Sequence, residues 1–170
     1  MIHSNKQAGF TLVEYLIYIA ISATLLLVAT NVLFTVLQGK EKLQAIEDVG
    51  QNGRYALAAM TQAISNAQSV TAPAYGASST TLTIQTSSTS TTPTSFFVAN
   101  GTVNIKEGSS PTTSLMADEV TVRTLRFTNV SGTATSTAIR IEMYVSSTNP
   151  EEDPDLAFDE IFRATATVRK

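Results

Sequence analysis

The sequence has no cysteine and no tryptophan, and its single histidine is His3. Without cysteine the chain can form no disulfide, and it offers no thiolate as a nucleophile or a metal ligand. One histidine excludes metal sites built from several histidines. The folded part of the chain must therefore be stabilised by packing and strand pairing.

Charge is also scarce, with a formal net charge of −3 over 170 residues. A mildly acidic balance shows no footprint of nucleic-acid binding. The sequence contains no glycine-rich phosphate loop, no nucleophile elbow and no spacing of metal ligands. We therefore expect no enzymatic activity, no cofactor and no nucleic-acid partner. The length suits one globular domain plus an anchor.

Proline is absent before Pro73, and the segment from Phe10 to Leu37 also lacks lysine, arginine and glycine. Its one ionisable carboxylate is Glu14. At about 1.5 Å per residue, a helix of this length reaches roughly 42 Å and can cross a hydrocarbon core of about 30 Å. The segment is predicted to be a membrane-spanning helix.

From Lys40 to about Val70 the apolar residues recur at spacings of three and four, which is typical of an amphipathic helix. This stripe consists of Leu43, Ile46, Gly50, Gly53, Leu57, Met60, Ile64 and Ala67. The pattern predicts one helix from about Thr11 to Ser69, with residues 10–37 in the membrane and residues 38–70 packed on a domain. A coiled-coil partner is the alternative. Gly50 and Gly53 mark either a kink or a close approach of the sheet.

Residues 71–170 are predicted to form a β-rich globular domain. Residues 71–95 are rich in serine and threonine and are expected to form loops around one short strand, Leu82 to Ile84. Asn100-Gly101 between two apolar runs predicts a two-residue hairpin turn. Further strands are predicted at residues 120–127, 138–145 and 161–168. A long helix followed by antiparallel strands defines an α+β fold, with the helix packed on the sheet.

An acidic cluster is predicted to form a loop before the last strand. It contains Glu151, Glu152, Asp153, Asp155, Asp159 and Glu160. The first four are candidate Ca²⁺ ligands, since calcium takes six to eight oxygens. Their spacing matches no defined calcium motif, and a solvated loop is the alternative interpretation.

The run Gly9-Phe10-Thr11-Leu12-Val13-Glu14 resembles the class III signal sequence of type IV pilins and pseudopilins. The resemblance implies that residues 1–9 are a leader peptide. It also implies that a prepilin peptidase cuts between Gly9 and Phe10 and that the new amino terminus at Phe10 is methylated. Glu14 would then be the acidic fifth residue of the mature chain. The fold implied is the pilin fold.

A carboxylate in lipid is costly, on the order of 2.5–3.5 kcal/mol at a helix centre and less near an end. The family's filaments are taken to pair this carboxylate with the amino terminus of a neighbouring subunit. Cleavage after Gly9 would create such an amine at Phe10, and the pair would set the stagger between subunits. The alternative is that Glu14 lies at the membrane interface and reaches water.

Two departures from the family's major subunits favour a minor pilin or pseudopilin. Many major pilins have a C-terminal disulfide, and many have a proline where this chain has Asn31. Asn31 and Thr30 can bond back to the helix without breaking it.

The resemblance implies an inner-membrane protein, with its C-terminal domain outside the cytoplasm, that enters a filament of a type IV pilus or a type II secretion system. One possible place is the tip, where a subunit primes assembly. The implied partners are prepilin peptidase, other pilin subunits, the inner-membrane assembly platform and the lipid bilayer. The alternative is a single-pass anchored binding domain that does not polymerise.

Overall fold

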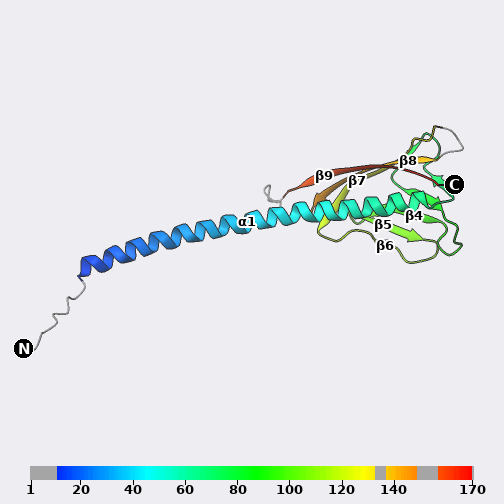
Figure 1. The fold of residues 1–170 in the computed structure, drawn as a ribbon. Coiled ribbons are helices and arrows are strands. Elements are labelled where there is room, and N and C mark those ends of the chain that lie inside the picture. The colour runs from blue at the N-terminus through cyan, green and yellow to red at the C-terminus, as the bar shows by residue number, and fades with distance from the viewer. Residues whose placement is uncertain (1–10, 133–136, 149–156, 170) are drawn as a thin grey trace, which may run out of the picture. The chain divides into compact units, whose positions relative to one another are not determined.

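The computed structural model describes residues 11–132, 137–148 and 157–169. The chain divides into two compact units, one ending at Lys40 and one beginning at Glu41. The first unit contains the amino-terminal part of helix α1, Leu12–Ser65. The second contains the rest of α1 and all the described strands (Figure 1). We call the second unit the domain.

Helix α1 ends four residues before the predicted end at Ser69, which is a correction. The backbone N–H of Ala67 donates to the Ile64 carbonyl, three residues back, so the last turn tightens. The N–H of Gln68 then donates to the Gln85 carbonyl at 2.8 Å. The chain leaves the helix because its backbone finds a strand partner at this point.

The domain holds two antiparallel sheets rather than the single sheet that the sequence suggested. The five-stranded sheet has the order β1-β3-β4-β5-β6 and the four-stranded sheet has the order β2-β7-β8-β9. The strands are β1 Ser69–Ala72, β2 Ser78–Ser79, β3 Leu82–Gln85, β4 Thr94–Ala99, β5 Thr102–Glu107, β6 Thr113–Ser114, β7 Val120–Asn129, β8 Ala138–Ser147 and β9 Asp159–Thr167. The α+β class with a long amino-terminal helix is confirmed.

The hairpin of β4 and β5 forms where the sequence predicted it. Asn100 and Gly101 both have positive φ, 53° and 75°. Two such residues in succession are what a tight primed turn needs, and asparagine and glycine adopt this conformation at little cost. Ala99 and Thr102 close the ladder on either side of the turn.

Three strand predictions need correction. The serine- and threonine-rich stretch expected to be mostly loop contains β2 as well as β3 and is overlapped at its start by β1, and the two-residue β6 was not predicted. β2 and β6 are polar strands of two residues, and β1 has only four, so none of them shows an alternation long enough to be recognised. Asp159 and Glu160, expected in the acidic loop, are the first residues of β9. They pair with Ser146 and Val145 of β8.

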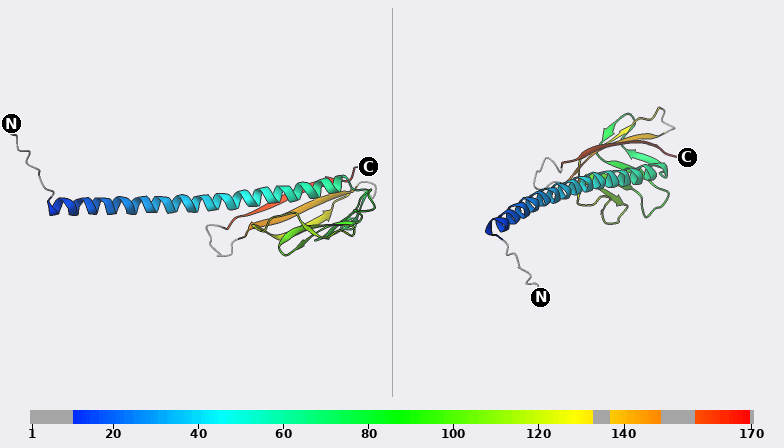
Figure 2. Two further views of the ribbon diagram at one scale, coloured as in Figure 1. Left: turned by 90° about the horizontal axis from the view of Figure 1, so that it is seen from below. Right: turned by 60° about the vertical axis from the view of Figure 1, so that its left-hand side comes forward.

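One core joins α1 to both sheets within the domain, as the strands beside the helix show in Figure 2. Its members from α1 are Val49, Ala56, Met60 and Ile64. Phe96 of the first sheet and Phe127 of the second are fully buried. The predicted stripe is therefore right from Gly50 onward, but Leu43 is 67% exposed and Ile46 is 37% exposed. The stripe begins at Val49 because the sheets cover the helix only from there.

The sheet approaches the helix closely at Gly53. A Cβ atom built on Gly53 would collide with the ring of Phe162 on β9. No side chain larger than hydrogen fits there unless that ring moves. Gly50 differs, because its neighbour is the flexible side chain of Arg54. The close-approach interpretation therefore holds for Gly53, and α1 is continuous through both glycines.

Candidate functional site

The proposed cleavage site, Gly9 and Phe10, lies outside the described residues, and so do Glu151, Glu152, Asp153 and Asp155. Among the residues that the structure describes, no group of three or more acidic or histidine side chains is placed to hold a metal ion. The predicted assembly residue, Glu14, is described. It lies in the first turn of α1.

Thr11 caps the helix that carries Glu14. The Glu14 backbone N–H donates to the Thr11 hydroxyl oxygen at 3.3 Å. This satisfies one of the donors that a helix leaves unpaired at its start. It also fixes Glu14 in the first turn, where the helix dipole favours a negative charge. Sequence reasoning missed Thr11, although a threonine followed three residues later by glutamate is a recognised start signal.

The surface of α1 from Leu12 to Leu37 is apolar on every side. Its large apolar side chains are all exposed in the isolated chain, from Leu12 at 77% to Leu37 at 46%. Within the described residues, α1 is the one helix long and apolar enough to span a membrane. A surface of this kind needs lipid or other apolar helices around it.

Four polar side chains in this apolar part of α1 bond back to their own helix. Thr30 donates to the Leu26 carbonyl at 2.8 Å, and Asn31 donates to the Leu27 carbonyl at 3.0 Å. The back-bonding predicted for these two residues is confirmed. Thr24 and Thr35 make the same bond. A hydroxyl satisfied in this way can enter lipid without an unpaired donor.

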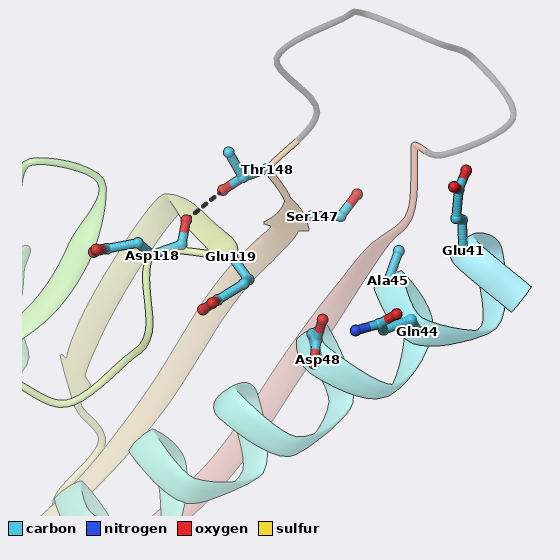
Figure 3. A pocket seen from close by; sticks show the side chains of 8 residues that line it. All are labelled: Glu41, Gln44, Ala45, Asp48, Asp118, Glu119, Ser147 and Thr148. Atoms are coloured by element: carbon cyan, nitrogen blue, oxygen red, sulfur yellow. Dashed lines mark hydrogen bonds between the residues drawn. The ribbon is translucent and has the colours of Figure 1, made fainter.

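Two charged surfaces that the sequence did not reveal lie on the domain. The first, the acidic groove, has a volume of about 440 Å³. Figure 3 shows α1 forming one wall and the residues next to β7 and β8 forming the other. Its lining residues are Glu41, Gln44, Ala45, Asp48, Asp118, Glu119, Ser147 and Thr148. Four of them are carboxylates and none is a cation.

Hydrogen bonds hold the walls of the acidic groove in place. The Asn52 side chain accepts from the Ala117 N–H at 3.0 Å and donates to the Asp48 carbonyl at 2.9 Å. On the other wall the Thr148 hydroxyl donates to the Asp118 carbonyl at 3.0 Å. The groove is thus built from three distant parts of the chain.

The second surface, the arginine face, is the side of β7, β8 and β9 that is turned away from the core. It carries Arg123, Arg126, Arg140 and Arg163, all exposed. Strand register places Glu142 directly between Arg126 and Arg163. Arg163 pairs with Glu142 at 3.2 Å, the one ion pair within the described residues.

The arginine face has one more polar contact near its edge. The Tyr144 hydroxyl donates to Asp159 at 2.6 Å, and this bond raises the pKa of Tyr144 above its ordinary value. Arg123 donates to the Ser146 hydroxyl at 3.2 Å. Arg126 and Arg140 have no partner among the described residues. Within the described part of the chain, the face therefore presents two unpaired guanidinium groups.

The family model for the prokaryotic N-terminal methylation motif matches residues 4–30. The match covers the Gly9–Phe10 junction, Glu14 and the first turns of α1. Searches of the curated proteins and of the solved structures found no match to this chain.

The motif and the long apolar helix together support a type IV pilin-like protein. More particularly, the motif implies a pilin- or pseudopilin-type protein that prepilin peptidase processes and that assembles with other pilins. The apolar helix near the amino terminus is consistent with an anchor in the inner membrane.

Proposed function

We propose that this chain is a structural subunit, of the minor pilin or pseudopilin kind, and not an enzyme. It is stored in the inner membrane by the apolar part of α1, with its domain outside the cytoplasm. Prepilin peptidase cuts it between Gly9 and Phe10. The assembly platform then moves it into a type IV pilus or a type II secretion pseudopilus. One position proposed for it is the tip, where a subunit primes assembly.

The observation that carries this proposal is the continuity of the methylation motif with an uncovered apolar helix. The motif ends at residue 30, inside α1, and the apolar surface continues to Leu37. Glu14 sits in the capped first turn of that helix. A plain anchor needs only the apolar surface. A carboxylate at this position, directly after a cleavage motif, suits a helix that also pairs with a neighbouring subunit.

The minor class is favoured by what α1 lacks. Asn31 stands where many major pilins have proline, and its amide bonds to the Leu27 carbonyl within an unbroken helix. The chain also has no cysteine for a C-terminal disulfide.

The proposal is tested by the intact mass and amino-terminal sequence of the protein from membranes of a cell with its own prepilin peptidase. We expect a chain that begins at methylated Phe10. Gly9→Lys should leave the full-length precursor, because a bulky charged side chain does not fit the position of a small one at the cut. Gly9→Ala is the matched control and should still be processed.

A chain that still begins at Met1 would overturn the proposal and favour an anchored binding domain that does not polymerise. A normal mature mass for Gly9→Lys would show that the cut lies elsewhere.

A further inference from the structure

We infer that the arginine face of one domain binds the acidic groove of a second copy of this chain. The inference rests on the filament role in the proposed function and deepens it, because it names a contact between the domains of successive copies of this chain. A single copy at the tip would not make this contact. The inference is carried by two surfaces of opposite charge, neither of which is fully neutralised by the residues that the structure describes.

The arginine face is a sheet face without a cover. Arg140 lies between Thr128 and Thr165 in the strand register, and both neighbours are neutral hydroxyls. Arg126 lies beside Glu142, but the carboxylate of Glu142 pairs with Arg163 on its other side. Among the described residues, four guanidinium groups and two carboxylates, those of Glu142 and Asp159, lie on this surface. The face is thus positive although the whole chain is acidic.

The acidic groove is its complement. Asp118 and Glu119 are exposed, Asp48 is half-buried, and none of these three carboxylates has an ion-pair partner among the described residues. Lys40 and Lys42 flank Glu41 in sequence but do not line the groove. Guanidinium groups carry the charge opposite to that of carboxylates, and the geometry of their hydrogen-bond donors fits the two carboxylate oxygens.

The two surfaces cannot meet within one domain. The core residues of β8, Ile141 and Met143 among them, point toward the helix side of the sheet, so Arg140 points to the other side. The groove lies on the helix side, between α1 and the end of β8 at Ser147. A contact between two different surfaces leaves one of each free at every addition. Such a contact builds an open chain of subunits unless the rotation closes a ring.

A second copy fits the arginine face better than a nucleic acid does. A phosphate backbone is uniformly negative and would meet the carboxylates of Glu142 and Asp159. The groove is mixed, since its walls also carry the amide of Gln44 and the hydroxyl of Thr148. These groove donors can hydrogen-bond to the carboxylates of the arginine face, which phosphate groups would repel.

The absence of cysteine allows a clean cross-linking test in the full chain in membranes. Thr165→Cys marks the arginine face beside Arg140, and Gln44→Cys marks the groove. The two single variants are expressed together and treated with a short flexible bis-maleimide. We expect a cross-linked pair of the two variants, and much less product from either variant alone.

Charge reversal shows whether the arginines carry the contact. Arg140→Glu in the Thr165→Cys chain should lower the yield about fivefold or more, because like charges then face each other. Glu119→Arg in the Gln44→Cys partner should restore the cross-linking yield. Such a rescue would show that the Arg140→Glu variant is folded. Lys106→Glu, a change of the same kind on β5, is the control and should leave the yield unchanged. Added salt should weaken the wild-type cross-link.

The amino-terminal mass of the same samples separates this inference from the proposed function. A chain processed at Phe10 that gives no cross-link overturns the inference and leaves the proposed function standing. A cross-link in a chain that is not processed supports the contact and overturns the filament role. Binding of duplex DNA that Arg140→Glu abolishes, without a cross-link between copies, would show a nucleic-acid surface and defeat the inference.

Discussion

The two parts of helix α1 use the same backbone for opposite purposes. From Leu12 to Leu37 the large apolar side chains are all exposed. From Val49 to Ile64 one side alone is buried, while polar residues such as Gln51, Arg54 and Gln62 stay exposed. An all-round apolar helix needs apolar surroundings from outside the chain, whereas a one-sided helix finds them within its own domain. One continuous helix can therefore depend on apolar surroundings from outside the chain in one part and on the core of its own domain in the other.

Glycine sharpens the comparison. Gly39, in the first unit, would have nothing within 4 Å of an added Cβ, whereas Gly53 would collide with Phe162. At Gly39 a larger residue would fit, so glycine only lowers the stability of the helix. At Gly53 glycine is required, because any side chain would meet the Phe162 ring. Three substitutions test these contrasts, in order of decreasing expected effect.

Phe127→Ala should destabilise the domain by about 3–5 kcal/mol, because it removes a fully buried ring and leaves a cavity. Urea-dependent proteolysis of the intact chain in detergent measures the loss. Phe34→Ala is the matched control in the apolar part of α1, where the ring is 59% exposed. It should leave domain unfolding unchanged. Equal losses for both variants would mean that Phe34 also packs within the chain.

Glu14→Val should enter the membrane at least as well as the wild type, since it removes a carboxylate that costs up to about 3 kcal/mol in lipid. Its incorporation into filaments should fall strongly, because the pairing with a neighbouring amino terminus is lost. Membrane fractionation and the amount of subunit in sheared filaments measure the two effects.

Glu47→Val, on the exposed polar side of α1 in the domain, is the control for Glu14→Val and should assemble normally. Normal incorporation of Glu14→Val would defeat the assembly role assigned to its carboxylate.

Gly53→Ala should destabilise the domain by up to about 2 kcal/mol, since overpacking costs about 1–3 kcal/mol and the better helix propensity of alanine returns about 1 kcal/mol. The same proteolysis assay measures it. Gly39→Ala gains the propensity without the collision and should not destabilise the chain. A stabilised Gly53→Ala would mean that the Phe162 ring moves aside freely.

Local patterns predicted much of the fold. The Asn100-Gly101 turn, the strands β7, β8 and β9, and the polar side of α1 all followed from residues close in sequence. Two of the errors share one physical cause. Helix α1 ended at Ser65 rather than Ser69, and β1 went unpredicted, because Gln68 and Val70 pair with β3 residues that are remote in sequence.

The residues of the candidate site also differ in how far the sequence alone predicted them. The motif around Gly9, Phe10 and Glu14 is a short run, so the sequence predicted it and the family match at residues 4–30 agrees with it. Thr11 belongs to the same run and was readable from its spacing to Glu14. The four calcium candidates from Glu151 to Asp155 lie outside the described residues and stay predictions.

The sequence by itself determined the class of this protein, because the cleavage motif and the apolar run are contiguous and need no folding to be recognised. Only the tertiary structure decided where the charges lie. The acidic groove joins α1 to residues beside β7 and β8, and the arginine face joins three strands. Charges spread along the chain look like ordinary solvated surface until packing gathers those of one sign onto one side of a sheet.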